Sequence, residues 1–424
     1  MLEPFRVPVW LRAVFTGSNR HLTRPYPVRA KHLAWCLARS LMHSLDRFAQ
    51  DKLDDLKRRH LYRALSETMR EDGIWLDRNG RQLLSFSCND YLNLTQHPAI
   101  KTAAIAAIEN YGAGSGASRL VTGNHPLYAQ LESRLAQFKR TEAACVFGSG
   151  YLANTGIIPV LIGKTGLLLV DELSHACIYA GAHLSRGKVM TFHHNDLAHA
   201  RELLAAHRTE HEHALIVTDG VFSMDGDLAP LAELLALANE YDAWLMSDDA
   251  HGIGVVGGGR GSSFAGNTHI PVPLQMGTLS KALGSYGGYL CASGAVIELM
   301  RNRARTLIYS TGLPPACVAA AIAALDLIER EPAYAALPVQ KARAFTKCAG
   351  LPEAQSPIVP IIIGSEEKAM AASRYLEDEG YLVVAIRPPT VPPGTARLRL
   401  TFTAQHPDDA IDRLADIVRD KILA

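Results

Sequence analysis

The sequence has almost no net charge, and this excludes one class of function. Its 424 residues include 43 lysines and arginines and 42 aspartates and glutamates, which leaves a formal net charge of +1. A balance so close to zero creates no field that would gather polyanions, and no basic stretch interleaves aromatic residues as a nucleic-acid groove does. We therefore expect no nucleic acid among the partners of the chain.

Paired cysteines and long apolar runs are also missing. The seven cysteines are scattered and contain no CxxC pair, which argues against a disulfide framework and against a structural zinc site. The longest apolar segment, 316–325, is about half as long as the roughly 20 residues of a membrane span. These absences indicate a protein of a reducing compartment, the cytoplasm, with no membrane partner.

Apolar residues, by contrast, are plentiful. They make up 48% of the chain against 20% charged residues, so the sequence can bury a large core and is not disordered. At 424 residues the chain exceeds the roughly 100–200 residues of one domain. We expect two or three structural units.

The first 41 residues differ from the rest in charge. They contain seven basic residues and four prolines, whereas Glu3 is the only acid. Three interpretations stay open: an upstream extension of the reading frame before Met42, an arm that packs on a partner subunit, or a targeting segment, which is typically rich in arginine and poor in acids. After Met42, apolar residues recur at helical spacing between Leu45 and Leu61, which predicts an amphipathic helix.

Short apolar runs alternate with helical patterns through the body of the chain. Strands of this kind between helices indicate an α/β fold, with a mostly parallel sheet that is covered on both faces. Helical stretches such as 231–239 separate several of the strands. The predicted strands are Ala144–Phe147, Leu167–Val170, Lys188–Phe192, Ala214–Thr218, Trp244–Ser247, Leu274–Met276 and Gly288–Cys291.

After Pro314 and Pro315 the pattern changes. A long alanine-rich helix is followed by three more predicted strands and two more helices, which together indicate a smaller α+β domain at the C-terminus. The strands are Ile358–Ile363, Tyr381–Ile386 and Leu398–Phe402, and the helices are Glu366–Glu379 and Pro407–Val418.

Polar and reactive residues follow five of the seven strands. In an open parallel sheet the ligand lies at the carboxyl ends of the strands, so we expect these residues to converge on one site. They are the turn 148–151, Asp171 with His175, and the segments 219–223, 248–251 and 277–281.

The converging groups suit one cofactor. The small-residue turn 148–150, directly before a helix, offers backbone N–H groups to a phosphate. Thr278 and Ser280 add hydroxyls, and Lys281 has an amine that forms a Schiff base when its pKa is lowered. An aspartate at a strand end can keep a ring nitrogen protonated, and a histidine can stack on a flat ring. Together these groups predict a pyridoxal phosphate site.

Eight short motifs add a resemblance to a known family. They are 87–92 (SCNDYL), 114–119 (GSGASR), 150–154 (GYLAN), 173–176 (LSHA), 221–227 (VFSMDGD), 248–252 (DDAHG), 278–281 (TLSK) and 309–311 (YST). With these motifs in order, the chain from about residue 45 to its C-terminus resembles the α-oxoamine synthases, a family of pyridoxal phosphate enzymes of fold type I.

The resemblance implies an aminotransferase-like fold. A large domain has a mostly parallel seven-stranded sheet flanked by helices, and a small C-terminal α+β domain follows it. The implied division is a basic extension at 1–41, an N-terminal helix and small-domain segment at 42–90, the large cofactor domain at 91–315 and the small domain at 316–424.

The resemblance also assigns roles to single residues. Lys281 matches the lysine that holds the cofactor and moves the Cα proton of the substrate, and His175 matches the histidine stacked on the ring. Asp248 matches the partner of the ring nitrogen, and His251 the partner of the phenolic oxygen. Arg399 would bind the amino-acid carboxylate in a bidentate pair, which a lysine cannot form. Further cofactor contacts are expected from Gly150, Tyr151, Ser223 and Thr278, and further substrate contacts from Arg63, Asn89, His175 and Thr390.

The implied reaction joins an amino acid to an acyl thioester, after which carbon dioxide is lost. Residues 386–392, with their paired prolines, most resemble the family member that joins L-alanine to a pimeloyl thioester, on coenzyme A or a carrier protein, in biotin biosynthesis. Enzymes of the glycine C-acetyltransferase, 5-aminolevulinate synthase or serine palmitoyltransferase type, and a subunit without activity, stay open as alternatives. Because family members are homodimers with a shared active site, Ser310 and Thr311 are expected to reach the phosphate of the partner's cofactor.

Several positions depart from the family's pattern. Asn93 stands where glycine is common, Asp219 where glutamate is usual, and Cys177 where a small residue such as serine is common. The span 331–357 is shorter than in the family, so we expect part of a helix to be missing from the small domain.

Other histidines and one arginine have ordinary interpretations. Residues 207–211 match the HxxEH pattern of zinc proteases, but this polar segment has no apolar helix around it, which predicts a solvated helix end. We interpret His193, His194 and His199 as structural. For Arg119 a surface ion pair and a substrate contact both stay open.

Overall fold

The computed structural model describes residues 43–59, 61–78, 80–266 and 268–423. The chain divides into two units, 1–66 and 67–424. The predictions made for residues 1–41 lie outside the described residues.

The first unit contains the predicted amphipathic helix, α3 (Ser44–Arg58). Asp46 lies in its first turn, and Lys57 and Arg58 lie in its last turn, an arrangement that complements the helix dipole. Leu61 lies beyond the end of this helix, so the helix is shorter than the apolar spacing indicates.

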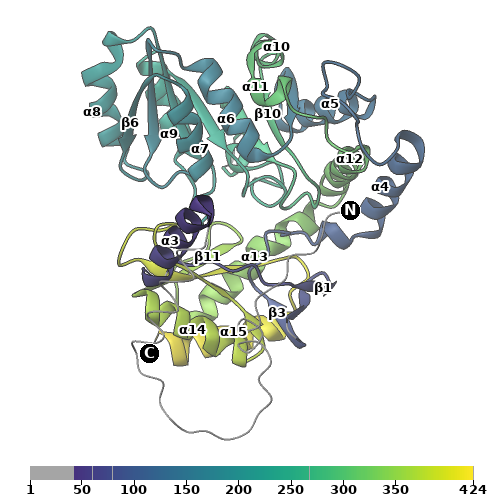
Figure 1. Ribbon diagram of the computed structural model, residues 1–424, viewed down its shortest axis with the longest axis vertical. Helices are drawn as coiled ribbons and strands as arrows, with labels where there is room; N and C mark the ends of the chain where they lie inside the picture. The colour runs from purple at the N-terminus through teal and green to yellow at the C-terminus, as the bar shows by residue number, and fades with distance from the viewer. Residues whose placement is uncertain (1–42, 60, 79, 267, 424) are drawn as a thin grey trace, which may run out of the picture. The chain divides into compact units, whose positions relative to one another are not determined.

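The second unit contains a seven-stranded sheet with the strand order β4-β10-β9-β8-β7-β5-β6. Two of its strands, β6 and β10, are labelled in Figure 1. β10 runs antiparallel to both of its neighbours, and the remaining pairs are parallel. The predicted seven-stranded, mostly parallel sheet is therefore confirmed. Its strands are β4 (Ala143–Phe147), β5 (Gly166–Asp171), β6 (Lys188–Phe192), β7 (His213–Asp219), β8 (Trp244–Asp248), β9 (Leu274–Thr278) and β10 (Gly288–Ala292).

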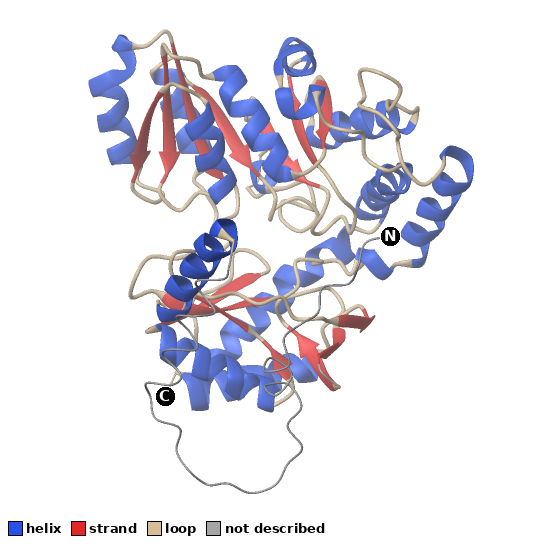
Figure 2. Cartoon of the chain, in the orientation of Figure 1, coloured by secondary structure: helices blue, strands red, loops and turns tan. Residues whose placement is uncertain are grey.

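Helices cover both faces of this sheet (Figure 2). Successive residues of a strand point to opposite faces, so Leu168 and Leu169 of β5 belong to different core clusters. One face packs against α6 (Gly150–Leu161), α7 (Ala176–Leu184), α10 (Gly294–Arg303) and α11 (Arg305–Ile308), and the other against α5 (Leu127–Lys139), α8 (Leu197–His207), α9 (Leu231–Glu240) and α12 (Pro315–Arg330).

The helix α12 is the predicted alanine-rich helix. It packs against α4 (Pro98–Tyr111) and α5, and its buried residues share a core cluster with β4 and β10. The predicted domain boundaries stay predictions, but the helix that they assign to the small domain has its buried face in the core of the large sheet.

Two smaller sheets share a second core, which confirms the predicted α+β region. β1 (Met69–Asp72), β2 (Trp75–Arg78), β3 (Arg81–Ser85) and β12 (Tyr381–Leu382) form one sheet, and β11 (Ile358–Gly364), β14 (Ala396–Thr401) and β13 (Val384–Ile386) form the other. The helices α13 (Pro332–Ala349), α14 (Glu366–Asp378) and α15 (Asp408–Ile417) pack with them. The short span 331–357 therefore still holds a helix of 18 residues.

One predicted strand is wrong, because the segment 381–386 contributes to both small sheets. β12 pairs with β3, whereas β13 pairs with β14. Between them the hydroxyl of Ser87 donates to the carbonyl of Leu382 at 3.2 Å and accepts the N–H of Val384 at 3.0 Å. This side chain satisfies the backbone where the chain changes sheets, and the apolar pattern of the segment is the same on both sides of the change.

Short helical turns complete the second unit. They are the 3-10 helices η1 (Leu94–Gln96), η2 (Arg208–Glu210) and η3 (Ser262–Phe264) and the π-helix η4 (Val418–Ile422). Within the described ranges, no helix combines the length and the apolar character that crossing a membrane requires.

Candidate active site

The carboxyl ends of the large sheet's strands surround a cavity of about 220 Å³. The parallel strands present these ends to one edge of the sheet, which is why residues far apart in the sequence meet there. The structure brings together seven residues predicted for the site, while their individual roles stay predictions. These seven are Gly150, Tyr151, His175, Asp248, His251, Thr278 and Lys281.

Lys281 lies in the turn between β9 and β10, and its amine is 2.8 Å from Nε2 of His251. Burial lowers the pKa of this amine to about 8, although the carboxylates of Asp248 and Asp219 act in the opposite direction. A larger fraction of the amine is therefore uncharged near neutral pH than in an ordinary lysine, and the uncharged form is the nucleophile.

Asp248 and Asp219 end two neighbouring strands, β8 and β7, and pair in register. Asp248 accepts the N–H of Ala250 at 3.0 Å and the amide of Asn154 at 2.7 Å, one at each carboxyl oxygen. Burial, with the added charge of Asp248, raises the pKa of Asp219 well above its ordinary value. The raised pKa favours the protonated form of Asp219, whereas Asp248 accepts two hydrogen bonds, one at each oxygen.

A chain of hydrogen bonds joins Asp248 to His175. The amide of Asn154 that donates to Asp248 also donates to Sγ of Cys177 at 3.0 Å, and this sulfur lies 2.8 Å from Nδ1 of His175. Burial lowers the pKa of His175 and raises the pKa of the Cys177 thiol to about 12, so the ring is neutral and the thiol keeps its proton. Sequence reasoning missed Asn154, although it lies within one of the family motifs.

A second chain joins Lys281 to Arg399. His251, which contacts Lys281 through Nε2, has its Nδ1 2.7 Å from the hydroxyl of Tyr91. The tyrosine oxygen lies 3.3 Å from Oδ1 of Asn89. Arg399 donates to this asparagine oxygen at 3.2 Å. Burial lowers the pKa of His251 well below its ordinary value and raises the pKa of Tyr91 to about 12. Sequence reasoning also missed Tyr91, which lies in the motif that contains Asn89.

Of the residues of the second unit predicted to contact substrate, His175 lines the cavity, whereas Asn89, Thr390 and Arg399 do not. Arg399, on β14, is buried and donates through Nε to the carbonyl of Ser223, a predicted cofactor contact that also lies outside the wall. Thr390 is exposed and is not brought to the cavity. Arg63 belongs to the first unit, so its predicted place at the site entrance stays a prediction.

The loop after β7 is held by charges from two sides. On one side Arg397 of β14 pairs with Asp225 at 2.5 Å. On the other side His194 contacts Asp227 at 2.8 Å and Asp171 at 3.1 Å. Burial lowers the pKa of His194, but the two carboxylates outweigh burial and raise it to about 10. His194 is therefore a cation that ties this loop to the end of β5.

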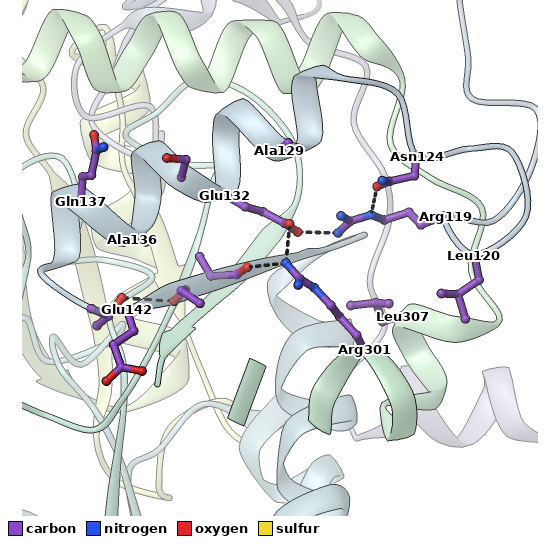
Figure 3. Close-up of a pocket in the computed structure, with 14 residues that line it drawn as sticks. Arg119, Leu120, Asn124, Ala129, Glu132, Ala136, Gln137, Glu142, Arg301 and Leu307 are labelled. Atoms are coloured by element: carbon purple, nitrogen blue, oxygen red, sulfur yellow. Dashed lines mark hydrogen bonds and ion pairs between the residues drawn. The ribbon is translucent and has the colours of Figure 1, made fainter. Parts of the chain in front are cut away.

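A larger cavity, of about 680 Å³, lies elsewhere in the second unit (Figure 3). Glu132 of α5 pairs there with Arg119 at 2.6 Å and with Arg301 at 3.0 Å. Glu132 also accepts the N–H of Val146, Arg119 donates to the carbonyl of Val146, and Arg301 donates to that of Ala144. Of the two interpretations of Arg119, the structure shows the ion pair, and this pair is mostly buried.

Two other sequence predictions concern backbone conformation. The HxxEH segment 207–211 ends α8 and continues as η2, and Arg208 donates to the carbonyls of Tyr241 and Asp242. It is a helix end, as predicted.

Asn93 has a φ of 54°, in the left-handed region that glycine and asparagine tolerate best. This departure from the family's glycine therefore keeps the shape of the backbone.

The groups around the smaller cavity fit pyridoxal phosphate. Lys281 offers an amine of lowered pKa to an aldehyde, and Asp248 offers a carboxylate fixed at both oxygens to a ring nitrogen. The side chain of Ser149 caps the N–H of Leu152, which leaves the N–H groups of Gly150 and Tyr151, at the start of α6, for a phosphate. A Cβ on Gly150, at this helix end, would lie 3.3 Å from Cε of Met276 and 3.6 Å from Cβ of Thr278, so a side chain would narrow the space there.

The chain is similar to known proteins along most of its length. Residues 81–418 match the model of the family "Aminotransferase class I and II". A Methylocella silvestris protein named 8-amino-7-oxononanoate synthase is 68% identical over 343 residues, which are 81% of this chain and 98% of that protein. A Beijerinckia indica protein of the same name is 61% identical over 377 residues, 89% of this chain and 98% of that protein.

Solved structures show the same fold. A serine palmitoyltransferase from S. paucimobilis, solved with PLP and myriocin bound, has a TM-score of 0.82 and 28% identity and covers 89% of this chain and 98% of its own. The 8-amino-7-oxononanoate synthase of Francisella tularensis has a TM-score of 0.69 and 26% identity and covers 80% of this chain and 98% of its own.

Proposed function

The chain belongs to the class I and II aminotransferase family, and we propose that it is an 8-amino-7-oxononanoate synthase that uses pyridoxal phosphate. Its substrates would be L-alanine and a pimeloyl thioester, which condense with loss of carbon dioxide and release of the thiol. The observation that carries this proposal is the 68% identity to a protein of that name, 98% of which is covered. Lys281 at the cavity argues against a subunit without activity.

A second candidate is a serine palmitoyltransferase type of enzyme. The structural likeness favours it, because the TM-score to that enzyme is 0.82. The sequence favours the first candidate, because identity to the palmitoyltransferase is 28% against 68% to the first relative. The two reactions differ in the amino acid and in the length of the acyl chain, so substrates distinguish them.

The cavity residues would hold the cofactor at different points. Lys281 would bind its aldehyde carbon, Asp248 its ring nitrogen and His175 one face of its ring, while the N-terminus of α6 and Thr278 would face its phosphate. When bound, pyridoxal phosphate supplies an acceptor for the electron pair left at Cα of the amino acid. Asp248 would keep the ring nitrogen protonated, since its two oxygens are fixed by Ala250 and Asn154.

Lys281 is the group that would move the Cα proton. Burial lowers its pKa to about 8, so its uncharged form is available as a base close to neutral pH. The nearby ring of His251 stays neutral because burial lowers its pKa, and it forms a hydrogen bond with this amine without adding a second positive charge.

Arg399 would bind the carboxylate of the amino acid. Its guanidinium is already oriented, because Nε donates to Ser223 and a terminal nitrogen donates to Asn89. A fixed planar guanidinium recognises a carboxylate with two parallel hydrogen bonds, which also fixes the direction of the Cα bond to be broken.

We further propose a cytoplasmic homodimer with a shared active site, in which Ser310 and Thr311 reach the partner's cofactor. The family resemblance supports this arrangement, and light scattering coupled to size-exclusion chromatography measures it. We expect a dimer, and a monomer with full activity would contradict the shared site.

A substrate panel tests the reaction. Purified protein loaded with pyridoxal phosphate is mixed with alanine, glycine or serine and with pimeloyl, acetyl or palmitoyl coenzyme A, while free thiol and product mass are measured. We expect turnover with alanine and the pimeloyl thioester. Turnover with serine and the palmitoyl thioester would support the second candidate, and release of thiol with glycine but not with alanine would refute the first.

A further inference from the structure

The phenol of Tyr91 is completely buried, and its shortest contact with a predicted catalytic residue is with Nδ1 of His251, at 2.7 Å. We propose that Tyr91 is a positioning residue that holds His251 in the tautomer with its proton on Nε2, the nitrogen 2.8 Å from the amine of Lys281. The consequence for catalysis rests on the proposed function, whereas the tautomer itself depends only on the chain.

The direction of the hydrogen bond follows from the distances. The hydroxyl of Tyr91 has one proton and two acceptors, Nδ1 of His251 at 2.7 Å and Oδ1 of Asn89 at 3.3 Å. The Asn89 oxygen already accepts a hydrogen bond from Arg399 at 3.2 Å. A bond of 2.7 Å is near the optimum for a hydroxyl donor, whereas 3.3 Å lies beyond the usual range. The phenol therefore donates to His251.

The titration behaviour of both groups supports this direction. Burial raises the pKa of Tyr91 to about 12, so the phenol keeps a proton to donate. Burial and the charge of Lys281 lower the pKa of His251 well below its ordinary value, so its ring has a single N–H. A neutral imidazole that accepts at Nδ1 must have its proton at Nε2. In this tautomer Nε2 donates to the uncharged amine of Lys281, the form whose share the lowered pKa of Lys281 increases.

The chosen tautomer determines what the cavity offers to a ligand. With its proton on Nε2, His251 can donate to an anionic oxygen beside Lys281, which is the role that the family resemblance gives it toward the phenolic oxygen of the cofactor. Without Tyr91 both tautomers become accessible, and part of the population presents a bare nitrogen. The same chain of contacts continues from Tyr91 through Asn89 to Arg399, so one phenol borders both the base and the carboxylate site.

The test is Tyr91→Phe, which removes only the hydroxyl. The matched control is Tyr289→Phe, because Tyr289 is equally buried and its hydroxyl has no hydrogen-bond partner among the described residues. In the loaded enzyme we expect the pH midpoint of the cofactor's visible band to rise by about half to one unit in Tyr91→Phe. The phenolic oxygen of the cofactor then loses the hydrogen bond from His251, so it holds the proton on the nitrogen that joins the cofactor to Lys281 more strongly. We expect kcat to fall about threefold to tenfold, with the KM for alanine changed less than about twofold.

A double-mutant cycle shows whether Tyr91 acts through His251. In the background of His251→Gln, Tyr91→Phe is expected to cause no further shift of the midpoint. A full additional shift there would overturn the proposal, as would a shift in Tyr91→Phe no larger than that in Tyr289→Phe.

Nitrogen NMR of histidine-labelled protein without cofactor measures the tautomer directly, at a pH above the value of about 8 at which the Lys281 amine loses its proton and can accept from Nε2. The His251 resonances are assigned by their absence in His251→Gln, and we expect a protonated Nε2 and a bare Nδ1 in the wild type and a mixture in Tyr91→Phe. A proton on Nδ1 in the wild type would overturn the proposal. Failure to take up pyridoxal phosphate would refute the proposed function instead, and the NMR result would still decide the role of Tyr91.

Discussion

Two cavities of the second unit are lined by buried ionisable groups, and they differ in whether these groups have partners of opposite charge. In the larger one, Glu132 is paired with Arg119 at 2.6 Å and Arg301 at 3.0 Å. In the smaller one, the nearest polar partner of the Lys281 amine is a neutral histidine at 2.8 Å, and the pKa of Lys281 falls to about 8. The larger cavity is three times the volume of the smaller one, about 680 Å³ against about 220 Å³.

The comparison shows that volume does not identify the site. In the larger cavity the opposite charges compensate one another and are also bonded to β4, which is what a structural ion pair does. In the smaller cavity burial shifts the pKa values of Lys281, Asp219 and His251, and the neighbouring charges do not cancel these shifts. Perturbed groups that meet at strand ends are typical of catalysis, and four substitutions test the contrast.

Replacing Lys281 is expected to have the largest effect. Lys281→Ala removes both the cofactor's attachment and the base, so we expect kcat to fall by at least about 10⁴-fold and the visible cofactor band to be lost. Steady-state kinetics and absorbance measure the two effects. Lys188→Ala, which changes an exposed lysine of β6, is the control and is expected to leave both unchanged. Activity above about one hundredth of the wild type would show that Lys281 is not the base.

Asp248→Asn comes next. It keeps the size of the side chain but removes the charge expected to hold a proton on the ring nitrogen, so we expect kcat to fall roughly 10²–10³-fold. Thermal unfolding checks that the variant is folded. If kcat stayed within about threefold of the wild type, the charge of Asp248 would have no catalytic role.

A substitution in the larger cavity is expected to lower the stability of the protein and to leave kcat unchanged. Glu132→Gln removes the carboxylate that Arg119 and Arg301 share and leaves Arg301 only its exposed contact with Glu298. We expect the free energy of unfolding to fall by about 2–3 kcal/mol, less than for a fully buried pair because the Arg301 side chain is 41% exposed. Urea unfolding measures this loss. Glu298→Gln, which breaks an exposed contact of the same arginine, is expected to cost less than about 0.5 kcal/mol. A change of more than about twofold in kcat of folded Glu132→Gln would place this cavity in the catalytic machinery.

Asp219→Asn is expected to have the smallest effect on rate, within about threefold, because burial already favours the uncharged form of Asp219. Its effect is on pH dependence. A raised pKa in the folded state means that Asp219 adds stability at acidic pH, which is lost as pH rises from about 4, where the unfolded chain releases this proton. The variant should therefore gain stability relative to the wild type as pH rises toward neutrality. Urea unfolding at several pH values measures the difference, and parallel curves would contradict the assignment.

Much of the site could be predicted from the sequence because its residues follow strands directly. Lys281, Asp248 and His251 are each placed by a local pattern of apolar run and turn, and the parallel sheet then brings the strand ends together. Tyr91 and Asn154 could not be predicted in this way. Their contacts span 160 and 94 residues, and each depends on how helices and loops pack over the sheet.

The misplaced strand over 381–386 has a similar cause. An apolar segment can join any neighbouring sheet, and the contact with Ser87 that divides it lies 295 residues away in the sequence. The interpretation of His194 as structural was also incomplete, because no local pattern shows that carboxylates from two different segments converge on one imidazole.

The contacts of Glu132, Arg119 and Arg301 with β4 have a consequence for self-association. β4 is at one edge of the seven-stranded sheet, and a free edge is a template on which another chain can add a strand. The outward N–H and carbonyl of Val146 and the carbonyl of Ala144 are already bonded to these side chains. A neighbouring molecule would have to displace a buried ion pair to extend the sheet on this side, so the edge resists aggregation in the folded protein.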